Sequence, residues 1–300
     1  MDSKYYAIGM LFLSQTMFGI VGNFSLLSHY LVCYYNQRTL KPTDLILTHL
    51  TIANSLIILS EGIPQTMATF GLRQFFNDFG CKLVLYTQRV GRSMSIATTC
   101  LLSAYQATII SPSNSCWKDL KGKAPKSIAF SISLVWVIYM MINFIFPLYI
   151  HSKNIGKNMT VKKRDFEYCS TLGEDKLVSS LYAGLLMFPE VLLSGFMVFC
   201  SGFMVVILYR HKQQVQYIHT TLAFTRPSPE SRATQSILLL VSIFLAFYTL
   251  SSILQSFIAV LYNPSWCLVN ITAIISKCFP TICPFVMRWD STVLKFCFLK

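Results

Sequence analysis

Charged residues are scarce in this chain. They make up 12% of its 300 residues, whereas hydrophobic residues make up 54%. A soluble domain of this size carries about 25% charged residues. The shortfall argues against an ordinary water-soluble domain and indicates that lipid surrounds most of the chain.

The motifs of common enzymes and metal sites are also missing. The chain has no G-x-S-x-G, no H-E-x-x-H and no glycine loop of the phosphate-binding type. Its ten cysteines form no C-x-x-C pair, and its five histidines show no metal-ligand spacing. The sequence therefore predicts neither an enzyme nor a cofactor or metal site.

The formal net charge of +13 does not indicate a nucleic-acid partner. The basic residues form short clusters between long apolar runs. This pattern is typical of the cytoplasmic flanks of membrane helices, where Lys and Arg contact anionic lipid headgroups. Membrane lipid is thus the predicted partner of the basic clusters.

Seven apolar runs are long enough to cross a bilayer. The first is too long for the apolar core of a cleavable signal peptide. We predict an all-α membrane protein, a bundle of seven transmembrane helices that forms one domain over residues 1–300. The predicted spans are 7–33, 44–70, 83–110, 128–150, 177–209, 234–261 and 267–288.

Three features predict an extracellular N-terminus and a cytoplasmic C-terminus. With this orientation the cytoplasmic segments hold more Lys and Arg than the outer segments. Asn158 begins a glycosylation sequon in the outer loop 151–176. Cys81 and Cys169 both fall on the outer side, which favours a disulfide between them over two free thiols.

Five ionisable residues lie inside the predicted spans: Glu61, Arg89, Arg92, Glu190 and Lys277. Each costs about 2.5–3.5 kcal/mol to insert, so each needs a partner or a function.

Arg89 and Arg92 are three residues apart on one side of a helix, about 12 and 16 Å below Cys81. With Gln88 beside them, they predict a cavity for an anionic or strongly hydrogen-bond-accepting ligand. The alternative is internal pairing, in which Glu61 and Glu190 neutralise both arginines and join the helices. The sequence leaves both possibilities open.

Several positions resemble rhodopsin-like G protein-coupled receptors. Gly22-Asn23, the pair Cys81 and Cys169, Trp136 and Pro189 stand where those receptors have equivalent residues. The usual activation motifs are replaced. Tyr105-Gln106-Ala107 occupies the place of Asp-Arg-Tyr, Phe279-Pro280 that of Asn-Pro, and Asn54 that of an aspartate.

These departures resemble the type-1 vomeronasal receptors. The motifs extend over most of the chain: G-I-P-Q-T-M-A-T-F-G at 62–71, Q-R-V-G-R-S-M-S-I-A-T-T-C-L-L-S at 88–103, L-Y-R-H-K-Q-Q-V-Q at 208–216, S-P-E-S-R-A-T-Q-S-I-L-L-L-V at 228–241 and F-P-T-I-C-P-F-V at 279–286.

The resemblance implies a plasma-membrane receptor for small pheromone-like molecules that couples to an inhibitory-type G protein. Ligand contacts are expected at Glu61, Gln88, Arg89, Arg92 and Glu190. Contacts with the G protein are expected at Gln106, Arg210 and Lys212. The last two belong to a basic segment that we predict to extend the fifth span as a helix. A collar that contacts lipid is the alternative role of that segment.

Two other functions are alternatives to this one. The first is a bitter-taste-type receptor, against which the motifs of the third and seventh spans argue. The second is a small transporter or channel that uses Glu61, Arg89 and Lys277 as a relay. Internal repeats are common in such transporters, and none is evident here.

Overall fold

The computed structural model describes residues 3–37, 41–72, 76–111, 115–144, 163–166, 169–172, 176–218, 229–260 and 265–298. The elements, in chain order, are α1 (Ser3–Gln37), α2 (Pro42–Ile57), the π-helix η1 (Ile58–Gly62), α3 (Ile63–Thr69), α4 (Asp78–Ile110), α5 (Ser115–Phe144), β1 (Lys163–Phe166), β2 (Cys169–Leu172), α6 (Lys176–Ile218), α7 (Pro229–Val260) and α8 (Trp266–Phe298).

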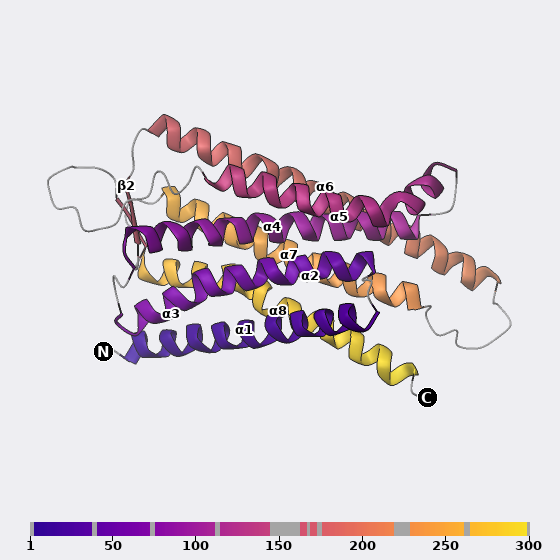
Figure 1. Cartoon of the computed structure of the whole chain (residues 1–300), viewed down its shortest axis with the longest axis horizontal. Coiled ribbons are helices and arrows are strands. Elements are labelled where there is room, and N and C mark those ends of the chain that lie inside the picture. The colour runs from indigo at the N-terminus through magenta and orange to yellow at the C-terminus, as the bar shows by residue number, and fades with distance from the viewer. Residues whose placement is uncertain are drawn as a thin grey trace.

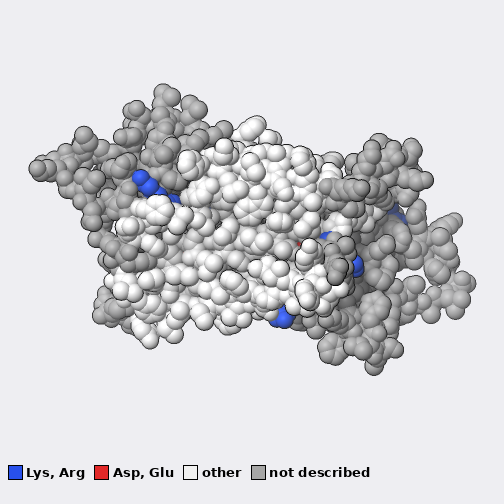
Figure 2. Space-filling model, viewed as in Figure 1, with Lys and Arg blue, Asp and Glu red and all other residues white. Residues whose placement is uncertain are grey.

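Within the described ranges, seven helical segments are long and apolar enough to cross a membrane, as the sequence predicts. They lie side by side along the long axis of the molecule, and the two termini lie at opposite ends (Figure 1). The second span is built from three elements, α2, η1 and α3, whereas each of the others is a single helix. Figure 2 shows a mainly uncharged band between the two ends of the molecule, which suits the hydrocarbon layer of a bilayer.

Several helices run further than the predicted spans. The helix α5, for example, already begins at Ser115, ahead of the predicted start at 128. The helix α6 continues to Ile218, which confirms the predicted helical extension of the fifth span. The helix α8 passes through Pro280 and Pro284 and ends at Phe298, ten residues beyond the predicted end at 288. Hydropathy finds the apolar part of a helix, and it misses a polar continuation of the same helix.

The centre of the bundle is α4, which packs against α2, η1, α5, α6 and α7. Its buried face is rich in hydroxyl side chains. Thr98, Thr99 and Ser103 each donate a hydrogen bond to a backbone carbonyl four residues earlier, at 2.6–3.0 Å. Because these hydroxyls find acceptors within the helix, polar residues can occupy the middle of a membrane bundle without unpaired donors.

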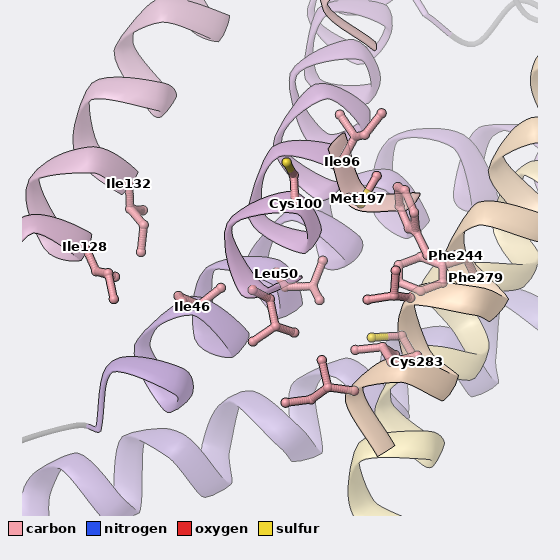
Figure 3. Packing of buried hydrophobic residues seen from close by; sticks show 14 residues of the cluster. Ile46, Leu50, Ile96, Cys100, Ile128, Ile132, Met197, Phe244, Phe279 and Cys283 are labelled. Carbon is pink, nitrogen blue, oxygen red and sulfur yellow. The ribbon is translucent and has the colours of Figure 1, made fainter. Parts of the chain in front are cut away.

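Apolar side chains from α2, α4, α5, α6, α7 and α8 form the main core cluster. Phe244 of α7 and Phe279 of α8 meet edge to face within it, with ring centroids 4.7 Å apart (Figure 3). Trp136 of α5 also donates its indole N–H to Nδ1 of His49 on α2, at 3.2 Å. The core thus holds α7 against both α4 and α8, where the candidate site lies.

The structure describes the start of α4 and a short antiparallel hairpin at the predicted outer end. The side chain of Asn77 caps α4 by accepting a hydrogen bond from the backbone N–H of Gly80, at 2.8 Å. Cys81 is in a disulfide. Cys169 is the first residue of β2, but its side chain is outside the described part, so its pairing with Cys81 stays a prediction. Asn158 also lies outside the described residues.

Candidate ligand-binding site

A π-helical turn places Glu61 inside the bundle. This turn, η1, has a wider hydrogen-bonding pattern than the α-helices on either side of it. Glu61 is 7% exposed, and Pro64 follows in the first turn of α3. A proline lacks the backbone N–H that a regular helix uses for its hydrogen bonds. Pro64 therefore interrupts the α-helical hydrogen bonding of the second span, and the irregular turn η1 lies directly before it. Turns of this type occur frequently at functional sites.

Both carboxylate oxygens of Glu61 accept a hydrogen bond from a neutral group. Gln88 of α4 donates to Oε2 at 2.9 Å, and Ser276 of α8 donates to Oε1 at 2.5 Å. Glu61 therefore joins the second, third and seventh spans. Among the described residues no cation contacts its carboxylate directly, and the buried ammonium of Lys277 is near enough to attract it electrostatically.

Arg92 lies one helical turn below Gln88 on α4 and turns toward α7. Its guanidinium donates to the hydroxyls of Ser251 and Ser252, at 3.4 and 3.2 Å. It also lies over the ring of Tyr248, 4.9 Å from the centroid. All three contacts are with neutral groups. Within the described part of the chain, no carboxylate forms an ion pair with Arg92.

Glu61 and Arg92 line one small pocket between the helices. Its cavity volume is about 30 Å³, which is room for about two water molecules. The polar part of the lining comes from α4, η1, α7 and α8, and the walls are largely aromatic. The lining residues are Ile57, Glu61, Gln88, Arg92, Ser95, Phe244, Phe247, Tyr248, Ser251, Ser276, Phe279 and Pro280.

The other two predicted ligand residues do not line this pocket. Arg89 is half-buried on α4. Glu190 is half-buried on α6, near enough to Tyr139 of α5 and Tyr248 of α7 to act on both electrostatically. The structure thus brings Glu61, Gln88 and Arg92 together at one pocket. Arg89 and Glu190 lie outside its lining.

Sequence reasoning missed the serines and aromatic residues that complete the pocket. Ser251, which lines the pocket, and Ser252, which binds Arg92, form a polar pair within an apolar run, and that break in the run is a usable signal. The aromatic side chains gave no such signal, because phenylalanine is common throughout membrane helices. Only the packing of α7 and α8 shows which of them face Arg92.

Lys277 has a structural environment of its own. Its side chain is fully buried, and its ammonium donates to Oε1 of Gln65 at 3.1 Å. The same ammonium lies 4.2 Å from the centroid of the Phe12 ring. Lys277 is therefore held by α1 and α3, outside the pocket lining, and the carboxylate of Glu61 in that lining attracts it electrostatically.

The residues predicted to contact a G protein lie toward the opposite end of the bundle. Gln106 is 6% exposed near the end of α4, whereas Arg210 is exposed on α6. Lys212 follows in the same helix, with its side chain outside the described part. A partner could reach Gln106 only after the neighbouring helix ends separate.

Comparison with known proteins decides the family. The model of the vomeronasal organ pheromone receptor family matches residues 6–299. The chain belongs to this family. It is 51% identical to human vomeronasal type-1 receptor 4 over 299 residues, which are 99% of each chain. It is 42% identical to human vomeronasal type-1 receptor 1 over 291 residues, 97% of this chain and 82% of the relative.

More distant similarity extends beyond the primate vomeronasal receptors. Olfactory receptor class A-like protein 1 of Danio rerio is 28% identical over 290 residues, 96% of this chain and 90% of the relative. Membership of the vomeronasal family confirms the resemblance seen in the motifs. With the seven apolar helices, it makes the chain a multi-pass pheromone-receptor protein of the plasma membrane, in the class of G protein-coupled receptors.

Proposed function

We propose that the receptor binds a small pheromone-like molecule in the pocket between η1, α4, α7 and α8, and that binding activates an inhibitory-type G protein. The environment of Arg92 carries the proposal. Two serine hydroxyls and the face of the Tyr248 ring hold the guanidinium of Arg92 beside a cavity. Its other N–H groups are therefore available to donate hydrogen bonds to a ligand. Family membership favours this function over a bitter-taste-type receptor and over a transporter.

The contacts of Arg92 suggest how binding changes the arrangement of the helices. Arg92 joins α4 to α7 through Ser251 and Ser252. A ligand that accepts hydrogen bonds from Arg92 competes with those serines and loosens this link. The cavity of about 30 Å³ is smaller than a pheromone-sized molecule, so entry requires α7 or its side chains to shift. The ligand therefore favours a state with a wider pocket.

In this proposal the G protein binds at the inner end of the bundle. When α6 and α7 move away from α4, Gln106 loses its cover and becomes available to a G protein. The helical extension of α6, which carries Arg210 and Lys212, supplies a basic surface beside it.

The test is G-protein activation in cells, with surface expression measured for each variant. The panel contains neutral and sulfated steroids, ketones and alcohols. We expect Arg92→Gln to abolish or strongly reduce responses to ligands with a strong hydrogen-bond acceptor, and pertussis toxin to abolish the signal of the unmodified receptor.

Arg89→Gln is the matched control, because it removes an arginine from the same helix without altering the lining of the pocket. A response lost in Arg89→Gln and retained in Arg92→Gln would move the binding site away from this pocket. Responses equal in both variants and in the unmodified receptor would return both arginines to a structural role. Glu61→Gln and Glu190→Gln, measured in the same assay, show which of the two predicted glutamate contacts the ligand response needs.

A further inference from the structure

Two consecutive residues of α8 are bonded to two residues of the second span. Ser276 donates to Oε1 of Glu61 at 2.5 Å, and Lys277 donates to Oε1 of Gln65 at 3.1 Å. Gln65 follows Glu61 by four residues, about one helical turn. From this double link we propose that Lys277 is the counter-ion of Glu61. It acts as a positioning residue, which keeps Glu61 ionised from outside the pocket lining and without touching a ligand.

Lys277 needs an anion that its direct contacts do not supply. The side chain is fully buried, and its ammonium contacts the amide oxygen of Gln65 and the face of the Phe12 ring, both of which are neutral. A charge in a membrane interior is costly unless an opposite charge lies close to it. Within the described part of the chain, Glu61 is the carboxylate that acts on Lys277 electrostatically.

Arg92, the cation that lines the pocket, is directed away from Glu61. Its guanidinium donates to two serines of α7 and lies over the ring of Tyr248. Tyr248 in turn is near enough to Glu190 of α6 to interact with it electrostatically. Arg92 therefore belongs with Glu190 on the side of α6 and α7, and Lys277 belongs with Glu61 on the side of α8, η1 and α3.

The charge of Lys277 determines what Glu61 presents to the pocket. A carboxyl group in apolar surroundings with no counter-ion takes up a proton and becomes a hydrogen-bond donor as well as an acceptor. Glu61 instead accepts on both oxygens, from Gln88 and from Ser276, as an ionised carboxylate does. A lysine on the far side of the lining thus fixes the acid of the pocket in its acceptor form.

Infrared spectroscopy measures the charge state of Glu61 directly, because a protonated carboxyl group has a carbonyl stretching band that a carboxylate lacks. The full-length receptor is measured at neutral pH in a maltoside detergent, which has no carbonyl group of its own. We expect Glu61 to be ionised in the unmodified receptor. Lys277→Met should gain the band of one protonated carboxyl group, and Glu61→Gln/Lys277→Met should lose that band again.

Arg92→Gln is the matched control, because it removes the cation of the pocket lining and leaves Lys277 in place. Glu61 should stay ionised in this variant. Arg92→Gln/Glu61→Gln and Arg92→Gln/Glu190→Gln show which glutamate accounts for any band that Arg92→Gln gains. The charge state is a readout that a purely structural role of Lys277 would not change.

The spectra can contradict the inference in three ways. A protonated Glu61 in the unmodified receptor overturns it, because a neutral acid needs no counter-ion. A protonated Glu61 in Arg92→Gln overturns it, because Arg92 is then the counter-ion. A Glu61 that stays ionised in Lys277→Met also overturns it. If Lys277→Met does not fold, the unmodified receptor and Arg92→Gln decide, and an ionised Glu61 in both supports the inference.

The ligand response gives a second reading, which rests on the proposed function. A protonated glutamate and a glutamine are both neutral and of similar shape. For a panel compound that activates the receptor, Glu61→Gln, Lys277→Met and the double variant should therefore shift the half-maximal concentration equally, to within about twofold. Shifts that multiply in the double variant overturn the inference. A receptor silent to the whole panel counts against the proposed function alone, because the infrared spectra decide the pair without a ligand.

Discussion

At the scale of single residues, the buried polar side chains of this receptor are held mostly by neutral partners. Lys277 shows the consequence. Its fully buried ammonium depends on Oε1 of Gln65 and on the face of the Phe12 ring. We expect Gln65→Leu to destabilise the receptor by about 1.5–3 kcal/mol, because a buried cation loses its acceptor. Thermal unfolding in detergent measures this. Gln65→Leu/Lys277→Met should recover most of the loss, and a double variant no more stable than Gln65→Leu would contradict the explanation.

Gly91 is a residue-scale requirement of a different kind. A Cβ atom there would lie 3.1 Å from the backbone carbonyl oxygen of Ala53, and backbone cannot rotate away as a side chain can. We expect Gly91→Ala to push α4 from α2 and to cost about 1–3 kcal/mol. Gly195→Ala is the control, because a Cβ atom at that position meets nothing within 4 Å. Equal surface expression and thermal stability of the two variants would show that the contact is not tight.

At the scale of elements, the second span departs most from what its sequence predicts. The sequence predicts one helical span over 44–70, and Pro64 near its outer end favours a kink there. The structure instead interrupts the helix with η1 just before the proline. Period and hydropathy locate a span, but they do not distinguish a π-turn from an α-turn, because the two differ by a single residue. The sequence shows the ionisable residues of the site. Which of them line the pocket depends on how α7 and α8 pack, and hydropathy and spacing do not reveal that packing.

The contact of η1 with α1 can be tested as a unit. A Cβ atom at Gly19 would lie 2.8 Å from Cδ1 of Ile58, the first residue of η1. We expect Gly19→Ala to lower thermal stability and the ligand response together, because the displaced turn carries Glu61. Ile58→Val removes the Cδ1 atom, so Gly19→Ala/Ile58→Val should recover part of both. If the double variant is worse than Gly19→Ala, close packing at Cδ1 is not the cause.

At the scale of the whole molecule, an odd number of spans requires the two ends of the chain to lie on opposite sides of the membrane. Figure 1 shows the termini at opposite ends of the bundle. The shape does not say which end faces outward. The small excess of Lys and Arg on one side predicts the direction, and a glycan can decide it.

Three sequons in the chain offer that test, and the structure separates them. Asn23 and Asn270 are 1% and 3% exposed. The side-chain amide of Asn23 donates to two backbone carbonyls, and that of Asn270 donates to one. An enzyme that transfers a glycan cannot reach either. Asn158 is in the segment between α5 and α6, on the same side of the membrane as the N-terminus.

We therefore expect one glycan, removed by Asn158→Gln and unaffected by Thr272→Ala, which destroys the sequon of Asn270 without altering its side chain. Gel mobility before and after treatment with an N-glycosidase measures it. A glycan on Asn158 fixes the hairpin outside, and it puts the α6 extension on the side of the membrane where a G protein is found. An Asn158 that stays unmodified in cells that glycosylate a reference receptor, together with an N-terminal tag detected only after permeabilisation, would reverse the orientation of all seven spans.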